Sequence, residues 1–450
     1  MLKKILIANR GEIAVRIIRA CRELGISTVA IYSEADRYAL HTQMADEAVC
    51  VGGPQSKDSY LNMINILSAC ILTGCEGIHP GFGFLSENPK FAKMCEECNI
   101  KYIGPDYKVI ELMGDKAKAR KIMKDAGVPV VLGYEGEIST VKEALEIAIE
   151  IGFPVMIKAA SGGGGKGIRI VRNSDEFEHN YNAAKLEAKA CFSDDRIYIE
   201  KFIEKPRHIE FQILADEFGN VIHLYERECS LQRNNQKVLE EAPSTFINQE
   251  TREKMGEVAK CAARAVNYKN AGTIEFLVDK DGNFYFMEMN TRIQVEHPIT
   301  EMITGVDLVK EQLKIASGMK LDLTQEDICI KGNAIECRIN AEDPDNNFRP
   351  CPGLIDELYI PSGPGVRVDS SIYAGYEIPP YYDSMIAKMI TYGMTRDEAI
   401  IKMKRALGEF AIGGVKTNID FQYDILTNRD FLKGNYDTSF VEEKLVRNNA

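Results

Sequence analysis

Residues 272–296 read GTIEFLVDKDGNFYFMEMNTRIQVE, the stretch that most constrains the fold of the chain. Its two strand-like runs flank Asp281-Gly282, a pair that favours a two-residue hairpin turn. With this turn, Glu275 and Glu288 lie directly opposite each other. Like charges in that position destabilise a hairpin, so the pattern predicts that a cation lies between the two carboxylates.

Asn290 completes a candidate metal site, because residues two apart in a strand share a face and Asn290 therefore lies beside Glu288. Two carboxylates and an amide oxygen are hard ligands that suit Mg²⁺ or Mn²⁺ bridging to phosphates. The alternative is a pair of solvated glutamates on an exposed strand face. The sequence thus predicts Glu275, Glu288 and Asn290 as metal ligands.

If the same strand stays extended to Glu296, then Arg292, Gln294 and Glu296 share one face. This pattern predicts that the face binds the substrate. Arg292 suits a bidentate grip on a small oxyanion, and Glu296 suits the removal of a proton. Lys237 adds another donor for anions, although its segment also fits a basic surface loop.

A glycine cluster, SGGGGKG at Ser161–Gly167, is a second signal. Consecutive glycines let backbone N–H groups wrap around phosphate oxygens. The loop differs from a Walker A loop, because Lys166 is followed by glycine and the flanking runs 155–159 and 168–172 both read as strands. We predict a flap over a nucleotide, with Lys158 and Lys166 near the phosphates; a mobile surface turn is the alternative.

The first hundred residues alternate strand and helix. Ile5–Ala8 reads as a strand, Gly11 opens a helix and Thr28–Tyr32 reads as the next strand, which predicts a parallel sheet. Glu34 and Asp36 lie near the place of a ribose-binding acid, but the first turn lacks G-x-G-x-x-G. A nucleotide-free Rossmann-like scaffold is therefore the better interpretation.

Length and composition bound the rest. A chain of 450 residues suggests about three domains, and we place a third unit from about Lys331 onward. Hydrophobic residues at 45% and charged residues at 27% oppose disorder and coiled coil. The net charge of −12 opposes a broad nucleic-acid or anionic-membrane surface. Apolar runs are too short for a membrane helix or a signal peptide, so we expect a cytoplasmic protein.

Cysteines and histidines offer weaker candidates. Cys70 and Cys75, with Cys95 and Cys98, fit a zinc site by spacing, but helical spacing after Asn88-Pro89 favours small core residues. His208 is either a core histidine or a group near the nucleotide. The remaining candidates, His41, His179 and His223, show no metal spacing.

Five segments carry a resemblance to a known family: Ala8-Asn-Arg-Gly-Glu-Ile-Ala14, Gly81-Phe-Gly-Phe-Leu-Ser-Glu-Asn88, Ser161–Gly167, Phe286-Met-Glu-Met-Asn-Thr-Arg292 and Gln294-Val-Glu-His-Pro298. In type and in order they resemble the biotin carboxylase family of the ATP-grasp superfamily. The resemblance implies a mixed α/β and α+β fold. Its parts are a Rossmann-like N-terminal domain at 1–113, an ATP-grasp domain at 114–330 with a glycine-rich lid at about 131–203, and a smaller C-terminal α+β domain at 331–450.

The resemblance also implies a ligase reaction. ATP phosphorylates bicarbonate to carboxyphosphate, which breaks down to CO₂ and phosphate; the phosphate takes the ureido proton of biotin, and biotin N1′ attacks CO₂. This is the first half-reaction of acetyl-CoA carboxylase in fatty acid synthesis. The equivalent subunit of a pyruvate or propionyl-CoA carboxylase is a near alternative. Another ATP-grasp ligase and an inactive ATP-binding regulatory module are more distant ones.

Matching positions imply the role of each site residue. Residues implied to hold bicarbonate are Lys237, Arg292, Gln294 and Val295, with Glu296 as the base. Arg338 is implied to stabilise the biotin enolate, and Glu275, Glu288 and Asn290 to hold Mg²⁺ or Mn²⁺. Residues implied to bind ATP are Lys116, Lys158, Gly164, Gly165, Lys166, Glu200, Lys201, Ile203, His208, Gln232 and Asn235.

The chain differs from the usual pattern of the family at a few positions. Asn235 stands where many members carry His or Tyr, and Phe82 replaces the usual Tyr. Members commonly form homodimers; Arg19 and Glu23 match positions used there, whereas 362–365 departs from the usual segment.

Carrier and transferase functions are expected on partner subunits. The segment Ile386-Ala-Lys-Met389 superficially resembles the Met-Lys-Met of a carrier domain but lacks its first Met, and the chain ends at Ala450 without room for a carboxyltransferase. We therefore expect a biotin carboxyl carrier protein and carboxyltransferase subunits as partners, with biotin arriving as a carried substrate.

Overall fold

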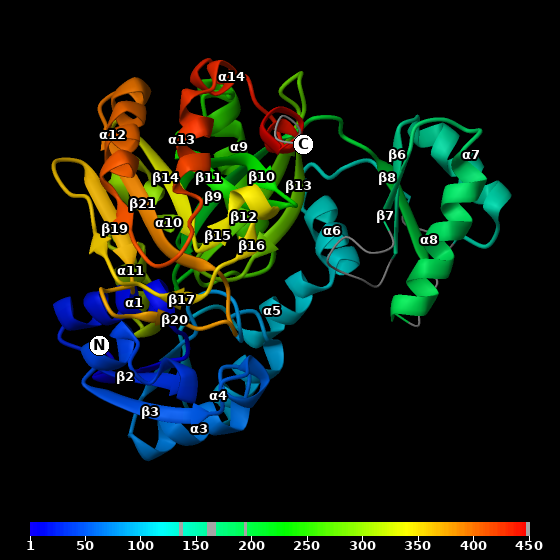
Figure 1. Ribbon diagram of the computed structural model, residues 1–450. Coiled ribbons are helices and arrows are strands. Elements are labelled where there is room, and N and C mark those ends of the chain that lie inside the picture. The colour runs from blue at the N-terminus through cyan, green and yellow to red at the C-terminus, as the bar shows by residue number, and fades with distance from the viewer. Residues whose placement is uncertain (135–137, 160–167, 193–195, 447–450) are drawn as a thin grey trace.

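A five-stranded parallel sheet opens the chain in the computed structural model, which describes residues 1–134, 138–159, 168–192 and 196–446 (Figure 1). The strand order is β3-β2-β1-β4-β5, and all neighbours are parallel. The elements are β1 (Lys4–Ile7), α1 (Gly11–Glu23), β2 (Ser27–Ser33), α2 (Leu40–Met44), β3 (Glu47–Gly52), α3 (Met63–Leu72), β4 (Gly77–His79), α4 (Pro89–Glu97) and β5 (Lys101–Tyr102). The predicted βαβ start is confirmed.

One of the two acids near the place of a ribose-binding acid, Asp36, has structural partners. Asp36 is buried after β2, where the Arg10 guanidinium contacts both carboxylate oxygens at 2.6 and 2.8 Å and the Tyr60 hydroxyl donates at 2.6 Å. Arg10 also lies over the Tyr382 ring at 4.2 Å, so a residue of the C-terminal third covers this end of the sheet. The geometry favours the scaffold interpretation.

The candidate zinc cysteines belong to the core of the parallel sheet. Cys70, Cys75 and Cys95 are buried in one apolar cluster, while Cys98 is exposed. Asn88 caps α4 by accepting from the Phe91 N–H at 3.0 Å, as the sequence predicted. Among the described residues, the groups with metal-compatible spacing contain none of these thiols, so the core interpretation holds.

An eight-stranded antiparallel sheet forms the body of the molecule, in the order β13-β12-β9-β10-β11-β14-β21-β19. Its strands are β9 (Arg207–Ala215), β10 (Val221–Arg233), β11 (Gln236–Ala242), β12 (Asn270–Val278), β13 (Phe284–Asn290), β14 (Asn333–Asn340), β19 (Val366–Ser370) and β21 (Met385–Gly393). Because β11 pairs with β14, the sheet crosses the expected boundary at residue 330 without a break. The domain boundaries stay predictions.

The two faces of this sheet differ in polarity. Ile209, Phe211 and Ile213 of β9 pack into an apolar core with α9 (Gln249–Ala265). The alternate residues His208 and Glu210 of the same strand are buried on the other face. That polar face forms the candidate site.

The predicted opposition of Glu275 and Glu288 is confirmed, but the predicted turn is wrong. The Asp279 N–H donates to the Asn283 carbonyl at 2.8 Å, so the loop is longer than two residues. Asp279 Oδ1 accepts from the backbone of Asp281 and Asn283 inside it, at 2.9 Å each. A bulge at Met287 then shifts the pairing by one residue and restores the expected register. The longer turn and the bulge shift the register in opposite directions, so Glu275 still faces Glu288.

The predicted extension of this strand to Glu296 is also wrong. β13 ends at Asn290, and α10 (His297–Thr304) begins after an irregular segment. The Thr291 N–H donates to Glu87 at 3.0 Å instead of to a neighbouring strand, and Pro298 favours the start of the helix. The polar row is therefore replaced by an irregular segment at residues 291–296.

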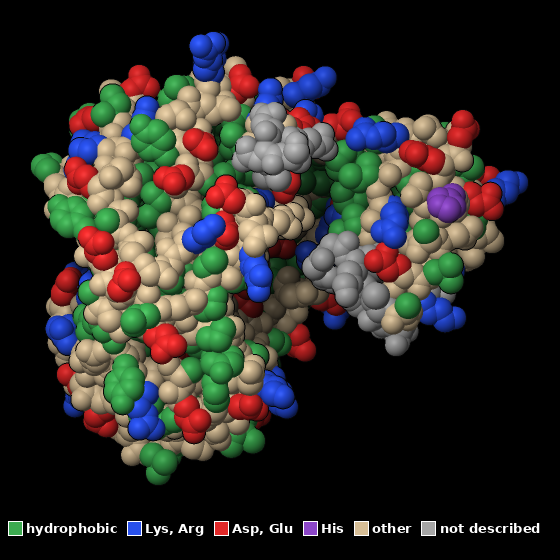
Figure 2. All heavy atoms as spheres, viewed as in Figure 1, with side chains coloured by type: hydrophobic (Ala, Val, Ile, Leu, Met, Phe, Trp, Pro, Cys, Tyr) green, Lys and Arg blue, Asp and Glu red, His purple; other side chains and the backbone are tan. Residues whose placement is uncertain are grey.

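A separate small unit carries the glycine loop. Strands β6 (Val155–Ala159), β7 (Ile168–Val171) and β8 (Ile197–Lys201) form an antiparallel sheet, packed against α7 (Val141–Ile151) and α8 (Phe177–Phe192). The unit stands beside the body in Figure 1, and Figure 2 shows a hollow between them. Residues 160–167 of the predicted flap lie outside the described residues.

The remaining elements link or cover these sheets, and together they confirm a mixed α/β and α+β architecture. They are α5 (Tyr107–Gly114), α6 (Lys116–Asp125), α11 (Leu308–Ala316), β15 (Glu342–Asp343), β16 (Arg349–Pro350), β17 (Gly353–Leu354), β18 (Leu358–Tyr359), β20 (Glu377–Ile378), α12 (Arg396–Glu409), β22 (Ala411–Ile412), α13 (Ile419–Thr427) and α14 (Arg429–Leu432). Within the described ranges, each helix is too short or too polar to span a bilayer.

Buried His41 makes the stability of the fold sensitive to acid. Burial lowers the pKa of His41 to about 4, and its Nδ1 atom has no hydrogen-bond partner among the described residues. Because the folded pKa lies below that of the unfolded chain, the stabilisation is complete above the unfolded pKa and is lost as the pH falls towards about 4.

His41→Gln should therefore flatten this dependence. We expect the fall in unfolding free energy between about pH 7.5 and about pH 5 to shrink by about 2 kcal/mol in urea titrations. His179→Gln, at an exposed position of α8, is the matched control. An unchanged pH dependence in the His41 variant would refute the assignment.

Candidate active site

The ammonium of Lys237 lies at the centre of the polar face. Its Nζ contacts Glu210 Oε2 at 2.6 Å, Glu275 Oε1 at 3.0 Å and Glu296 Oε1 at 2.6 Å. These carboxylates come from β9, β12 and the segment before α10, and all are buried. Burial lowers the pKa of Lys237, but the three carboxylates outweigh it and raise the pKa well above its ordinary value.

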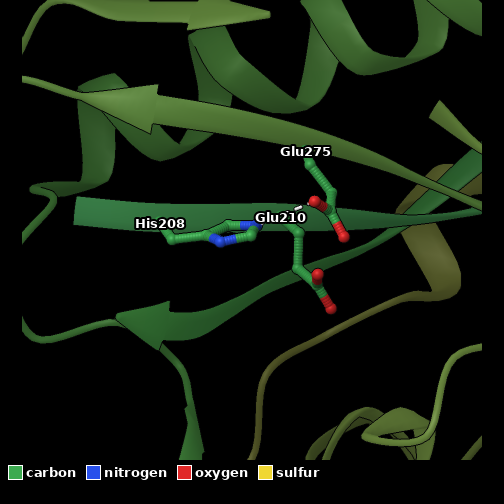
Figure 3. A group of neighbouring side chains, drawn as sticks. All are labelled: His208, Glu210 and Glu275. Atoms are coloured by element: carbon green, nitrogen blue, oxygen red, sulfur yellow. Dashed lines mark ion pairs between the residues drawn. The ribbon is translucent and has the colours of Figure 1, made fainter. Parts of the chain in front are cut away.

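His208, Glu210 and Glu275 point toward one another, as Figure 3 shows, from strands β9 and β12. His208 Nε2 lies 3.0 Å from Glu275 Oε2, and its Nδ1 lies 2.8 Å from Gln232 Nε2. The three side chains have spacing that suits a metal ion. Lys237 already contacts both glutamates, however, so an internal cation balances this cluster.

Arg227 holds Glu210 from the other side. The guanidinium is completely buried and donates to Glu210 Oε1 at 2.6 Å, Gln212 Oε1 at 2.8 Å and Thr300 Oγ1 at 2.9 Å. The sequence interpretation missed Glu210 and Arg227. The alternation of polar His208, Glu210 and Gln212 with apolar residues in β9 is the signal that could have revealed the first of them.

Arg292 joins the predicted metal and anion residues. Its NH2 donates to Asn290 Oδ1 at 2.9 Å and its NH1 to Gln294 Oε1 at 3.0 Å. Its Nε donates to Glu87 Oε2 at 2.9 Å. Glu87 comes from the N-terminal sheet unit, far away in sequence, and no local pattern predicts this contact.

Arg338 of β14 reaches the same cluster from the C-terminal part of the sheet. Its Nε donates to Glu240 Oε1 at 2.6 Å and its NH2 to Glu296 Oε2 at 2.9 Å. Glu296 therefore has Lys237 on one oxygen and Arg338 on the other. Burial raises the pKa of Glu296, but these two cations outweigh it and hold the pKa well below its ordinary value.

Glu240, on β11, is the second acid that the sequence interpretation missed in this region. Burial raises the pKa of Glu240 to about 7, although Arg338 opposes the shift. The site thus pairs an ionised carboxylate, Glu296, with one that accepts a proton near neutral pH. Only the pairing of β11 with β14 places Glu240 beside Arg338.

The predicted metal ligands lie together and retain oxygen donors. Asn290 Nδ2 donates to Glu275 Oε1 at 2.8 Å, and Glu288 Oε2 lies 3.3 Å from Lys116 Nζ. Glu288, Asn290 and Lys116 line one cavity of about 200 Å³. Carboxylate and amide oxygens suit Mg²⁺ or Mn²⁺. Any such ion must share Glu275 with Lys237 and the Asn290 amide oxygen with Arg292.

The predicted nucleotide residues divide between the small unit and the body. Lys158 forms an ion pair with Glu200 on adjacent strands β6 and β8. Lys201 Nζ donates to the carbonyls of Gly152 and Phe153 at 2.9 and 3.0 Å, which ties its side chain to the small unit. Gly164, Gly165 and Lys166 lie outside the described residues.

The other predicted nucleotide residues differ in burial and position. Ile203 lies where β8 leads into β9, and Gln232 is buried beside His208. Asn235 is exposed at the turn between β10 and β11, with φ of +61°. Asparagine is one of the residues that tolerate this left-handed backbone. The turn keeps Asn235 apart from the buried cluster.

Three family models match successive parts of the chain. Biotin carboxylase, N-terminal domain, matches residues 1–110; Carbamoyl-phosphate synthase L chain, ATP binding domain, matches 115–324; and Biotin carboxylase C-terminal domain matches 336–443.

Individual relatives cover nearly the whole chain. A biotin carboxylase of Nostoc sp. is 60% identical over 440 residues, with 98% of each chain covered. One of the pyruvate carboxylase subunits of Methanothermobacter thermautotrophicus is 57% identical over 443 residues, covering 98% of this chain and 90% of the relative. A solved biotin carboxylase domain dimer of 2-oxoglutarate carboxylase from Hydrogenobacter thermophilus, in complex with MgADP, ADP and bicarbonate, has a TM-score of 0.92 and 53% identity, with 98% of each chain covered.

The two glutamates of the metal site should respond differently to removal of their charge. Glu288→Gln and Glu275→Gln should each weaken Mn²⁺ binding by about tenfold or more in electron paramagnetic resonance titrations, because each removes a hard anionic ligand. Only Glu275→Gln should also lower the melting temperature, because Glu275 pairs with Lys237 and His208 inside the protein.

Glu250→Gln, at an exposed position of α9, provides the control for these variants. Wild-type Mn²⁺ affinity in Glu288→Gln would contradict the assignment of this residue to the metal.

Proposed function

The chain belongs to the biotin carboxylase family, and from this premise we propose that it carboxylates biotin on a partner carrier protein with ATP and bicarbonate. The convergence of Lys237 and Arg338 on the two oxygens of buried Glu296 is the observation that carries the proposal. It supplies two cations for anionic reactants beside a carboxylate that stays ionised.

Bicarbonate activation is the first proposed step. Lys237, Arg292 and the Gln294-Val295 segment hold bicarbonate, and Glu296 takes its proton. A bicarbonate oxygen then attacks the γ-phosphorus of ATP, ADP leaves with the bond electrons and carboxyphosphate forms. When bicarbonate arrives, Lys237 and Arg338 also interact with this anion and stabilise the Glu296 carboxylate less. The pKa of Glu296 then rises towards that of a useful base.

Carboxyl transfer is the second proposed step. Carboxyphosphate breaks into CO₂ and phosphate, the phosphate takes the N1′ proton of biotin, and N1′ forms a bond to the carbon of CO₂. Arg338 stabilises the enolate oxygen of biotin. Its backbone carbonyl accepts from Asn418 Nδ2 at 3.0 Å and Gln422 Nε2 at 2.9 Å, so α13 and its cap support the arginine.

Nucleotide and metal binding complete the proposed site. ATP lies between the small unit and the body, and Mg²⁺ or Mn²⁺, when bound to Glu275, Glu288 and Asn290, neutralises charge on its phosphates. The residues proposed for ATP are Lys116, Lys158, Gly164, Gly165, Lys166, Glu200, Lys201, Ile203, His208, Gln232 and Asn235. Asn235 contributes through the backbone of its turn.

Proposed partners follow from the family. A biotin carboxyl carrier protein and carboxyltransferase subunits would supply and use the carried biotin in the cytoplasm, in an acetyl-CoA carboxylase. A pyruvate carboxylase is the near alternative, favoured by the match to one of the subunits of such an enzyme. A homodimer through α1 is supported by exposed Arg19 and Glu23, although Glu23 also pairs with Lys310 at 2.5 Å within the chain.

Bicarbonate-dependent ATP cleavage, measured with and without free biotin, tests the proposal. We expect ADP release to require bicarbonate, and added biotin to stimulate it with formation of carboxybiotin. Release of ADP that ignores bicarbonate would point to another ATP-grasp ligase. An absence of both activities would favour an ATP-binding regulatory module.

Arg338→Ala should separate the two steps of the reaction. Loss of enolate stabilisation should lower carboxybiotin formation by about a hundredfold or more, which is the cost of losing one strong electrostatic group. Bicarbonate-dependent ATP cleavage should fall much less, because Lys237 remains on Glu296.

Arg349→Ala, at an exposed position of the C-terminal part, controls for the loss of an arginine. Equal losses of both activities in Arg338→Ala would show that its role has been wrongly assigned.

A further inference from the structure

Lys388 is the lysine of the segment that superficially resembles a biotin-accepting motif. In the structure this side chain lies on β21 and is completely buried. A fully enclosed ammonium is inaccessible to a biotin-attaching enzyme. Burying the Lys388 ammonium costs several kcal/mol unless opposite charges and hydrogen bonds compensate for the lost water. The groups that contact it therefore indicate its role.

The ammonium of Lys388 connects three parts of the chain. Its Nζ donates to the carbonyl oxygen of Val295 at 2.8 Å and lies 3.1 Å from Glu12 Oε1 at the start of α1. It also lies 5.9 Å from the centre of the Phe82 ring. Glu12, Phe82 and Val295 thus meet at one buried charge, and each belongs to a segment that carries the family resemblance.

The shorter contact of the Lys388 ammonium goes to the Val295 carbonyl, at 2.8 Å, and the longer one to Glu12, at 3.1 Å. Among the described residues, neither oxygen of the buried Glu12 carboxylate has a hydrogen-bond partner, although the charge of Lys388 is close. Glu12 therefore supplies electrostatic compensation, while Val295 receives the aligned N–H. An ammonium has three donors, so Lys388 can hold the Val295 carbonyl and still compensate the charge of Glu12.

Val295 needs such a donor because regular secondary structure does not reach it. β13 ends at Asn290 and α10 begins at His297, so among the described residues the Val295 carbonyl lies outside any strand or helix. The preceding carbonyl, of Gln294, is likewise close to a side chain, His297 Nδ1, at 2.8 Å. The side chains of Lys388 and His297 thus contact carbonyls of this segment, and the His297 N–H also donates to the Gln294 carbonyl at 3.4 Å.

We propose that Lys388 is a positioning residue for bicarbonate: it fixes the Val295 peptide and thereby aligns the neighbouring Gln294 and Glu296. This inference rests on the proposed function, because it concerns the segment assigned to bicarbonate. It also gives the C-terminal part of the chain a second task beside Arg338. The two residues lie opposite each other on paired strands β14 and β21.

The expected consequence is selective. Lys388→Met removes the donor to Val295, so the KM for bicarbonate should rise by about tenfold or more. The KM for ATP should change by less than about twofold, because the nucleotide residues lie on other segments. Lys388→Arg retains a cationic donor and should recover most of the bicarbonate affinity. A residue with only a structural role would not separate the two KM values in this way.

Two further variants control for buried charge. Lys260→Met removes another buried lysine, which pairs with Glu257 at 2.5 Å on α9 away from the site, and should leave both KM values unchanged.

Glu12→Gln combined with Lys388→Met removes both charges of the buried pair. If Lys388→Met alone fails to fold, this double variant and Lys388→Arg carry the test. The double variant should retain the raised KM for bicarbonate, since Val295 still lacks its donor.

The measurement is bicarbonate-dependent ATP cleavage by the full chain, with bicarbonate and ATP varied separately. A wild-type KM for bicarbonate in Lys388→Met or in the double variant would overturn the positioning role. Wild-type protein without any bicarbonate-dependent cleavage would overturn the proposed function, and the positioning role with it. Active wild-type protein together with a selective rise of the bicarbonate KM supports both.

Discussion

One buried ammonium, that of Lys237, holds together the charges on which the rest of the site depends. It contacts three buried carboxylates, Glu210, Glu275 and Glu296, from separate elements of the fold. Without it, three like charges would face one another in a poorly solvated space, and breaking even one buried ion pair costs about 3–5 kcal/mol. Lys237 therefore acts first as an internal counter-ion.

This constraint also explains how an acidic chain can serve anionic reactants. The net charge is −12, yet Lys237, Arg292 and Arg338 converge at the site where the proposed function places anionic reactants. Their protein partners are carboxylates that an incoming bicarbonate or phosphate can replace in part. The unbroken sheet from β13 to β19 makes the convergence possible, because it carries Lys237 and Arg338 on neighbouring strands.

Local patterns predicted the elements and several site residues, but for reasons that the structure revises. The opposition of Glu275 and Glu288 is correct because a bulge at Met287 offsets an unexpectedly long turn. Arg292, Gln294 and Glu296 do belong to one cluster, although they lie on an irregular segment and not in an extended row. The alternation of side chains between two faces holds only within the strand. Directly after β13 ends, the Thr291 N–H donates to Glu87, a residue from another unit.

The contacts that the sequence interpretation missed are long-range or depend on burial. Glu210, Glu240 and Lys388 gain their significance from pairing between strands and from enclosure, neither of which is written in a short segment. The motif containing Lys388 even resembles one of different chemistry. Residue type and spacing can suggest a charged group, whereas its electrostatic balance requires the positions of all its neighbours.

The central claim is that Lys237 is shared between internal carboxylates and bicarbonate. Titration of ¹³C-labelled bicarbonate by nuclear magnetic resonance, with a non-hydrolysable ATP analogue present, measures this sharing without turnover. Wild-type protein should bind bicarbonate at least about tenfold more tightly than folded Lys237→Gln, because the variant loses the cation facing the anion. Equal affinities would show that bicarbonate is held by other groups and would contradict the account.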